Sequence, residues 1–196
     1  MKKFRIFIYL RLKFFLISFF VKNNGFSQKI CEKLNNITRK KFSILTSQLR
    51  VGFYLVLKYL KKNNPSKNEV IISSYNLAEM VNIPKNLNLK PIFPKLNKNI
   101  FLCPKDVKKK INKKTLAVVV TNIFNDNEDL ENIKKVCRYK NVTLIEDNAI
   151  YFGNFTKKKK LKIYSGSYGD YSLHSFNIMK NLCGLYGGSV STNNTE

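Results

Sequence analysis

The sequence predicts an α/β fold, in which helices cover both faces of a mostly parallel sheet to form a three-layer sandwich. Two observations lead to this prediction. Short apolar runs recur without the polar alternation of a strand that has one solvated face, at residues 70–72, 91–93, 116–120 and 142–145. Segments with helical spacing separate these runs, and an alternation of strands with helices is typical of a parallel sheet.

Residues 1–41 differ from the rest, and we expect them to form a basic amphipathic helical segment ahead of a main domain over residues 42–196. Residues 14–21 are apolar except for Ser18. This run is too short to span a bilayer, which needs about 20 residues, and no small-residue cleavage site follows it. Two interpretations stay open. Residues 1–24 lie on an anionic membrane surface, or the helix packs on the main domain or on a partner chain.

The first helix of the main domain is expected over residues 47–62, where apolar side chains recur at helical spacing. Thr46 or Ser47 can cap its start, and Asn63-Asn64-Pro65 ends it. Gly52 lies inside this helix, where alanine would be the better helix former. Three more helices are expected, over residues 76–88 with a kink at Pro84, 104–111 and 128–139.

The charge is strongly positive, with 36 Lys and Arg against 12 Asp and Glu and a net charge of +24. Such a balance can indicate binding to nucleic acid or to an anionic surface. A binding groove would need clustered cations, however, and these lysines are scattered along a chain that is also rich in Asn, Ile and Phe. We therefore favour a compositional bias, and nucleic acid is not an expected partner.

The cysteines indicate the compartment and argue against a metal site. There are four, and none has CxxC or other metal-ligand spacing, while the chain has one histidine. No metal is therefore expected. Free thiols fit a reducing compartment, so a cytoplasmic location is expected.

Lys180 is the most informative residue, because of the residues around it. It ends the stretch Asp170-Tyr-Ser-Leu-His-Ser-Phe-Asn-Ile-Met-Lys180, and Gly187-Gly188 follows closely. Upstream, the apolar run at 142–145 leads into Glu146-Asp147. A carboxylate at a strand end and a lysine on a later loop are the groups that an enzyme using pyridoxal phosphate (PLP) needs. The lysine forms a Schiff base, and the carboxylate keeps the pyridine nitrogen protonated.

Several stretches, in a fixed order, carry a resemblance to a known family. They are Thr46-Ser-Gln-Leu-Arg, Glu69-Val-Ile-Ile-Ser-Ser-Tyr-Asn, Val120-Thr-Asn-Ile-Phe-Asn, Leu144-Ile-Glu-Asp-Asn-Ala, Gly166-Ser-Tyr-Gly-Asp, and His174-Ser-Phe-Asn-Ile-Met-Lys with its later Gly-Gly. From about Phe42 onward, the chain thus resembles the DegT-type (StrS-like) sugar aminotransferases. These are fold-type-I PLP enzymes that act on nucleotide-linked keto-sugars.

The resemblance implies a role for each matched residue. Lys180 would bind PLP covalently and then act as the base that moves a proton between substrate and cofactor. Asp147 would pair with the pyridine nitrogen, and Ser175 would hydrogen-bond the cofactor phosphate. Thr46 and Ser47 would meet the same phosphate at a helix N-terminus. His174 is expected to be a packed strand residue, and Asn122 receives no role.

The family also implies the substrates and the assembly. The amino group would come from a donor, with glutamate expected, and would pass to a nucleotide-linked keto-sugar. Dehydration of the sugar is an alternative outcome that the residues leave open. Members of the family act as homodimers that complete the active site between subunits. They also continue through the rest of the large domain and a smaller C-terminal domain, so an incomplete chain is expected here.

Two positions depart from the family pattern. Leu77 stands where an aromatic ring usually stacks on the cofactor, although neighbouring Tyr75 could substitute. Ile150 replaces the polar residue expected three positions after Asp147. These departures support an alternative hypothesis, a non-catalytic homologue that binds a partner or an anionic membrane surface through its basic N-terminus.

Overall fold

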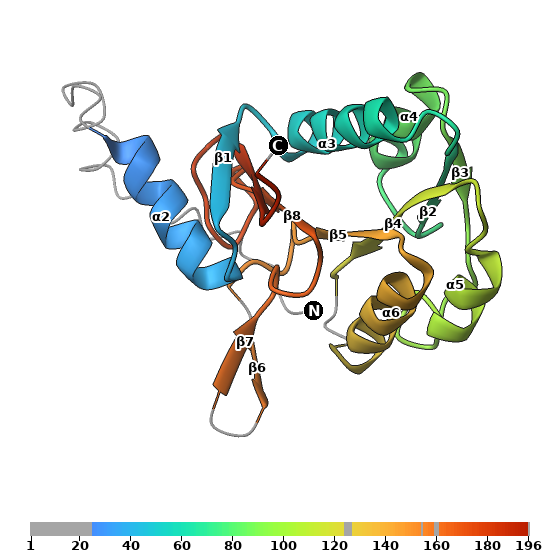
Figure 1. Ribbon diagram of the computed structural model, residues 1–196. Helices are drawn as coiled ribbons and strands as arrows, with labels where there is room; N and C mark the ends of the chain where they lie inside the picture. The colour runs from blue at the N-terminus through green and yellow to red at the C-terminus, as the bar shows by residue number, and fades with distance from the viewer. Residues whose placement is uncertain (1–24, 124–126, 154, 159–160, 196) are drawn as a thin grey trace, which may run out of the picture.

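The computed structural model describes residues 25–123, 127–153, 155–158 and 161–195. Its centre is a seven-stranded sheet with the order β1-β9-β8-β5-β4-β2-β3 (Figure 1). The strands are β1 (Phe42–Thr46), β2 (Glu69–Ile72), β3 (Lys90–Ile92), β4 (Thr115–Thr121), β5 (Thr143–Asp147), β8 (Tyr171–Ser175) and β9 (Gly188–Thr192). A separate hairpin of β6 (Phe155–Lys158) and β7 (Leu161–Tyr164) projects from the domain.

The sheet is mixed but mostly parallel. Strands β3, β2, β4, β5 and β8 pair in parallel, whereas β9 is antiparallel to both of its neighbours, β8 and β1. The carboxyl ends of β1, β5 and β8 therefore lie along one side of the sheet, together with the start of β9. This side, formed by strand ends, is the carboxyl edge. The opposite edge holds the starts of β5 and β8 and the end of β9.

Helices cover both faces, as Figure 1 shows. One layer consists of α3 (Leu49–Asn63) and α4 (Ala78–Asn86), and the other of α5 (Pro104–Lys110) and α6 (Asn127–Lys140). Each layer has its own apolar core. Phe53 and Leu57 of α3 are fully buried against the first face, and Leu130 and Ile133 of α6 against the second. The predicted α/β three-layer sandwich is thus present.

Helix α2 (Phe26–Thr38) lies beside the edge strand β1 (Figure 1). Leu34 and Thr38 are buried on it, and the Thr38 hydroxyl donates to the Leu34 carbonyl oxygen at 2.7 Å. Among the residues that the structure describes, no helix is long and apolar enough to cross a membrane. The predicted membrane contact of residues 1–24 falls outside the described part of the chain, and the domain boundary at residue 41 stays a prediction.

Three local expectations need correction. The residue that caps α3 is Gln48, without a side-chain hydrogen bond, so neither Thr46 nor Ser47 caps this helix. Helix α4 contains Pro84 within it and ends at Asn86, after which Asn88 takes a left-handed backbone with φ 55° and the N–H of Leu89 donates to the Pro84 carbonyl oxygen at 2.9 Å. Gly52 suits its position better than alanine would. A Cβ there would lie 2.6 Å from Cγ2 of Val190, so glycine allows α3 to pack closely on β9.

Candidate functional site

Three predicted site residues share one face of the sheet at its carboxyl edge. Thr46 and Ser175 both pair with Gly188, from the two sides of β9. Asp147 pairs with Leu173, two residues before Ser175. Because paired residues share a face and side chains alternate along a strand, all three project toward the layer of α3. Two strand spacings separate Thr46 from Ser175, so their Cα atoms lie about 10 Å apart.

The start of α3 lies directly against this edge, and Gly188 makes the approach possible. A Cβ on Gly188 would lie 2.3 Å from the backbone nitrogen of Leu49, and Gln48 forms a bridge to Gly187. No side chain caps the first turn of α3. Backbone N–H groups at a helix N-terminus attract anions. The edge between Thr46 and Ser175 therefore suits a phosphate group, with the Ser47 side chain exposed beside it.

Asp147 is buried, with 2% of its surface exposed, and its carboxylate is held in place. The backbone N–H of Ala149 donates to Oδ1 at 3.0 Å, and the hydroxyl of Thr121 donates as well. Asn76 Nδ2 in turn donates to Thr121 Oγ1 at 2.9 Å. Burial raises the pKa of Asp147, while these hydrogen bonds and the charge of Lys180 oppose the rise. A cationic partner at this carboxylate would remove part of that desolvation cost.

Hydrogen bonds join the two ends of the loop that carries Lys180 and connect this loop to the loop after β5. The N–H of Phe176 donates to the Gly187 carbonyl oxygen at 2.9 Å. Asn181 Nδ2 donates to the Ile150 carbonyl oxygen at 2.9 Å, which joins this loop to the one after β5. Lys180 is partly exposed, and its charge acts on the carboxylate of Asp147. The structure therefore brings the predicted lysine and carboxylate to one site.

Thr121 and Asn76 were not assigned a role from the sequence, although both lie in stretches that carried the resemblance. The sequence does not show the register of neighbouring strands, in which Thr121 of β4 pairs with Asp147 of β5. Only knowledge of which strands are neighbours places the threonine hydroxyl beside the carboxylate.

Glu146, next to Asp147, faces the other side of the sheet and is fully buried. It accepts hydrogen bonds from the backbone N–H groups of Gly166, Tyr168 and Gly169. Asn122 Nδ2 reaches its carboxylate more weakly, at 3.4 Å. Burial raises the pKa of Glu146, and the backbone hydrogen bonds oppose the rise. Glu146 thus orders the turn ahead of β8.

From Asn122, buried polar side chains continue across four strands on this face. Asn122 Nδ2 donates to Asn148 Oδ1 at 2.7 Å, and Asn148 Nδ2 donates to Ser172 Oγ at 3.1 Å. His174 lies between the hydroxyls of Ser172 and Ser189, at 3.1 Å from each. No buried side-chain nitrogen or oxygen in the described residues lacks a partner. This network fixes the positions of β5, β8 and β9, which carry Asp147 and Ser175 on the other face.

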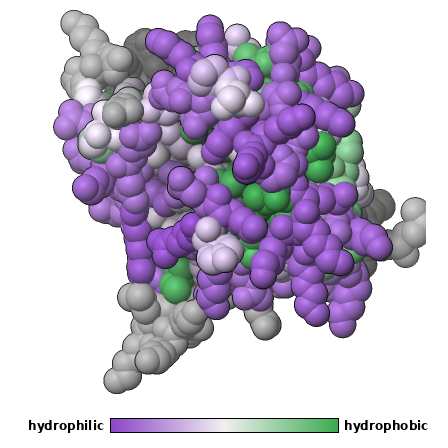
Figure 2. All heavy atoms as spheres, turned by 45° about the vertical axis from the view of Figure 1, so that its right-hand side comes forward, coloured by the Kyte–Doolittle hydropathy of each residue, from purple (hydrophilic) through white to green (hydrophobic). Residues whose placement is uncertain are grey.

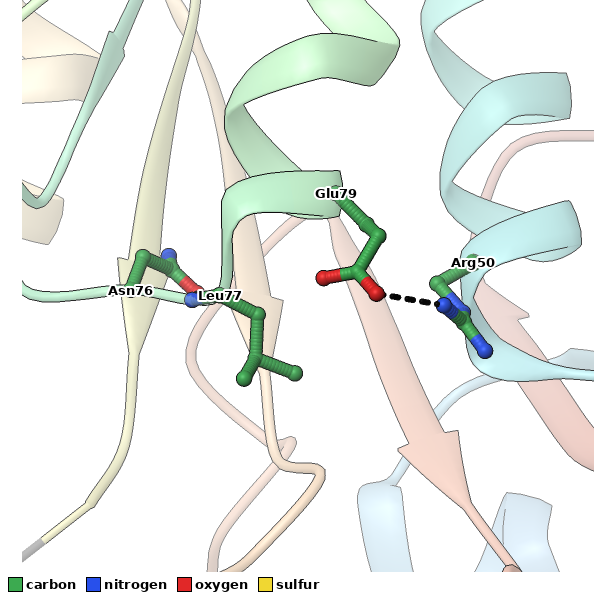
Figure 3. A network of polar contacts seen from close by, with 4 residues as sticks. All are labelled: Arg50, Asn76, Leu77 and Glu79. Carbon is green, nitrogen blue, oxygen red and sulfur yellow. Dashed lines mark hydrogen bonds and ion pairs between the residues drawn. The ribbon is translucent and has the colours of Figure 1, made fainter.

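Apolar side chains are exposed on the loops beside the candidate site. Leu77 is 64% exposed and lies just ahead of α4 (Figure 3), and Tyr75 is exposed nearby. An ion pair of 3.1 Å between Arg50 Nη1 and Glu79 Oε1 joins the first turns of α3 and α4 (Figure 3). Further exposed apolar side chains on the adjoining loops are Ile150, Met179, Leu182 and Tyr186.

Comparison with known proteins identifies the family. The sequence model of the DegT/DnrJ/EryC1/StrS aminotransferase family matches residues 15–196. The chain belongs to this family. The expected resemblance is thereby confirmed, and the match covers every stretch from which it was inferred.

The similar proteins described next are longer than this chain. GDP-perosamine synthase of Vibrio cholerae is 32% identical over 127 residues, which make up 64% of this chain and 34% of that protein. Helicobacter pylori PseC, an aminotransferase of pseudaminic acid biosynthesis, superimposes with a TM-score of 0.80 at 18% identity, over 94% of this chain and 49% of that one. An E. coli GDP-4-keto-6-deoxy-D-mannose-3-dehydratase with hydrated PLP superimposes with a TM-score of 0.78 at 16% identity, over 100% of this chain and 51% of that one.

These comparisons confirm the predicted fold, the large domain of a fold-type-I PLP transferase. The chain spans about half the length of the solved relatives, and about a third of the V. cholerae protein is matched.

Proposed function

We propose that this chain is part of a PLP-dependent aminotransferase that passes an amino group, with glutamate as donor, to a nucleotide-linked keto-sugar. The observation that carries the proposal is buried Asp147 at the same edge of the sheet as the uncapped N-terminus of α3, with Lys180 close enough for its charge to act on that carboxylate. The relatives named for GDP-perosamine synthesis and pseudaminic acid biosynthesis support the substrate class.

The residues present fit the cofactor. Asp147 is a buried carboxylate in need of a cationic partner, which a protonated pyridine nitrogen would supply. Gly188 leaves room for the α3 N-terminus, where backbone N–H groups, Thr46 and Ser47 would bind the phosphate from one side. Ser175 would bind it from the other, since it also pairs with Gly188.

PLP, when bound, supplies an electron sink that stabilises negative charge on the substrate carbon. Lys180 would hold the cofactor covalently and, once released, would move the proton at that carbon. Asp147 would keep the ring oriented and its nitrogen protonated. Asn76 and Thr121 would position Asp147 through their hydrogen bonds.

Covalent labelling tests this assignment. The protein is incubated with PLP, reduced with borohydride, and its modified lysines are mapped by peptide mass spectrometry. We expect modification concentrated at Lys180, and its loss in Asp147→Asn. Lys58→Ala removes an exposed lysine of α3 and serves as the control, which should label as the wild type does. Equal labelling of many surface lysines, or unchanged total labelling in Lys180→Ala, would contradict the proposal.

The reaction itself is tested by product mass. With a GDP-linked 4-keto-6-deoxy sugar, glutamate and PLP, amino transfer gives an amine-bearing sugar and 2-oxoglutarate. Dehydration gives a product that has lost water. Because the solved relatives are about twice as long as this chain, the assay should use both this chain and any longer form of the protein. An aminated product supports the proposal, and a dehydrated one would replace the reaction while keeping the cofactor.

We further propose that a second copy of the chain covers the exposed apolar side chains beside the candidate site. Leu77, Ile150, Met179, Leu182 and Tyr186 are exposed around one site, and exposed apolar clusters of this kind mark interfaces. Sedimentation equilibrium should show a dimer that Met179→Glu weakens. Tyr139→Glu, an equally exposed position on α6, should leave the dimer intact. A wild-type monomer would refute the pairing.

The alternative of a non-catalytic homologue is not favoured, because Lys180, Asp147 and Ser175 are all present and gathered at one edge. Cytoplasmic location and membrane contact through residues 1–24 stay predictions.

A further inference from the structure

A cavity of about 360 Å³ lies at the edge of the sheet opposite the candidate active site. It is bounded by the starts of β5 and β8 and the end of β9, which reach the cavity with Thr143, Tyr171 and Thr192. Each of these strands is five residues long, so the cavity lies about 13 Å from the edge that carries Asp147 and Ser175. It is therefore a separate place in the molecule.

The lining of this cavity is strongly basic. Four cationic side chains line it, Arg39 and Lys40 after α2 and Lys134 and Arg138 on α6, against a single carboxylate, Asp170. The four cations and one carboxylate give the lining a net charge of +3. Hydrophilic side chains cover most of the face seen in Figure 2, as expected from the scattered lysines. At the cavity, in contrast, four cations converge from two distant parts of the sequence.

Contacts hold three of the four cations in place, and none of these contacts is with a carboxylate. Lys40 is only 8% exposed, and its one acceptor among the described residues is the carbonyl oxygen of Gly169, so two of its three N–H donors are left over. Lys134 lies over the Tyr168 ring, 5.6 Å from its centroid. Arg39 Nη2 donates to the Lys162 carbonyl oxygen at 2.9 Å.

The nearby carboxylates do not pair with these cations. Glu146 is occupied by three backbone N–H groups, and Asp170 accepts the N–H of Leu144 at 2.8 Å. In the described part of the chain, none of the four cations forms an ion pair with a carboxylate. Burial lowers the pKa of both Lys40 and Lys134, and repulsion between the cations adds to this, while the charges of Glu146 and Asp170 oppose it. A cluster of unpaired cations is stabilised when an anion enters it.

The C-terminus of α6 lies near the cavity and would by itself disfavour an anion. Two of its last four carbonyl oxygens, those of Cys137 and Arg138, already accept hydrogen bonds from the N–H groups of Val142 and Asn141. These two bonds reduce the number of carbonyl oxygens that are left without a partner at this end.

We propose that this cavity is a binding site for a small multivalent phosphate anion of the diphosphate class. Its volume is at the lower end for small-molecule sites, about 300 to 1,000 Å³, and suits a diphosphate better than a polymer. Three net positive charges match the charge of a diphosphate. Lysine and arginine donors at an oxyanion form charge-assisted hydrogen bonds, the strongest kind available to side chains. The proposal does not depend on the PLP site.

Isothermal titration of the 196-residue chain with inorganic pyrophosphate, without PLP and at constant ionic strength, tests the proposal. We expect saturable binding with one site per chain. The double variant Lys134→Gln/Arg138→Gln removes two lining charges, and we expect it to weaken binding at least about tenfold. The control Lys135→Gln/Lys140→Gln makes the same charge change on the same helix at exposed positions outside the cavity, and it should weaken binding less than about twofold.

Thermal melts of the same proteins give a second measurement that also shows whether each variant folds. Pyrophosphate should raise the melting temperature of the wild type and the control, and not that of Lys134→Gln/Arg138→Gln. Absence of saturable binding to the wild type would overturn the proposal. So would an equal loss of affinity in the two double variants, because binding would then follow overall charge rather than this cavity.

Discussion

His174 makes the stability of this protein depend on pH in a way that can be measured cleanly, because it is the only histidine in the chain. It is fully buried in β8, stacks edge-on against Phe152 with ring centroids 5.0 Å apart, and bonds the hydroxyls of Ser172 and Ser189. Burial lowers the pKa of His174 from 6.5 to about 3. The folded chain therefore keeps a neutral imidazole where the unfolded chain takes up a proton.

The size of the effect follows from that difference in pKa. Since the folded pKa is lower than the unfolded one, stability is complete above pH 6.5 and is lost as the pH falls toward 3. The whole shift corresponds to roughly 5 kcal/mol, at about 1.4 kcal/mol for each pKa unit. Between pH 7 and pH 5 the loss should be about 2 kcal/mol. That is a large share of the ~5–15 kcal/mol by which a typical domain is stable.

Urea unfolding at pH 7 and pH 5, for the wild type and for His174→Gln, measures this loss. Burial raises the pKa of Glu146 and Asp147, so these carboxylates act in the opposite direction and favour the folded state as the pH falls. They are present in both proteins, and the difference between the two pH responses isolates the histidine. We expect the variant to lose about 2 kcal/mol less than the wild type between the two pH values.

An NMR titration follows the same proton directly, since a single histidine gives a single imidazole C2–H signal. That signal should stay at its neutral position from pH 8 to pH 5. A midpoint near 6.5 would refute the reasoning, and so would equal pH responses of the wild type and His174→Gln.

Three further substitutions test the candidate active site and its loop. Asp147→Asn should raise stability at pH 7, because a carboxylate whose pKa is raised by burial destabilises the fold once it ionises; the gain should vanish below about pH 4, where the carboxyl is neutral in both states. Gly188→Ala should cost about 2 kcal/mol or more in urea unfolding, since its Cβ would meet the backbone of Leu49 at 2.3 Å; an unchanged midpoint would contradict this close packing. Leu185→Gly should gain about 1 kcal/mol, because Leu185 has a left-handed backbone with φ 68°; a loss of stability would show that its side-chain packing outweighs the strain.

The parts of the fold that the sequence predicts are those whose strands are apolar on both faces. Strands β2, β4 and β5 belong to this group, and each overlaps one of the predicted runs. His174 was expected to be a packed strand residue, but the bounds of β8 and β9 were not predicted, because Ser172, His174, Ser189 and Ser191 interrupt any apolar pattern. These residues are nevertheless buried, and hydrogen bonds between side chains satisfy them. A polar layer inside a sheet cannot be told from a solvated face without knowledge of the neighbouring strand.

The residues of the candidate site also differ in whether the sequence alone predicts them. Asp147 and Lys180 are predictable from local motifs, one at the end of a buried run and the other ahead of a glycine pair. The support of Asp147 by Thr121 and Asn76 depends on strand register. The basic cavity was missed altogether, because Lys40 and Lys134 are far apart in the sequence and each looks like one surface lysine among many.

The buried polar layer of β8 and β9 and the carboxyl edge of the sheet differ in how well their residues are satisfied, and this difference supports a functional role for the carboxyl edge. The buried polar layer behind β8 and β9 is fully hydrogen-bonded. At the carboxyl edge, burial raises the pKa of Asp147, Leu185 has a left-handed backbone, and Met179 is exposed on the same loop as Lys180. Each of these features costs stability in the isolated chain. A carboxyl edge that carries such features, beside an interior whose buried polar groups are hydrogen-bonded, is expected where a cofactor or a partner compensates for them.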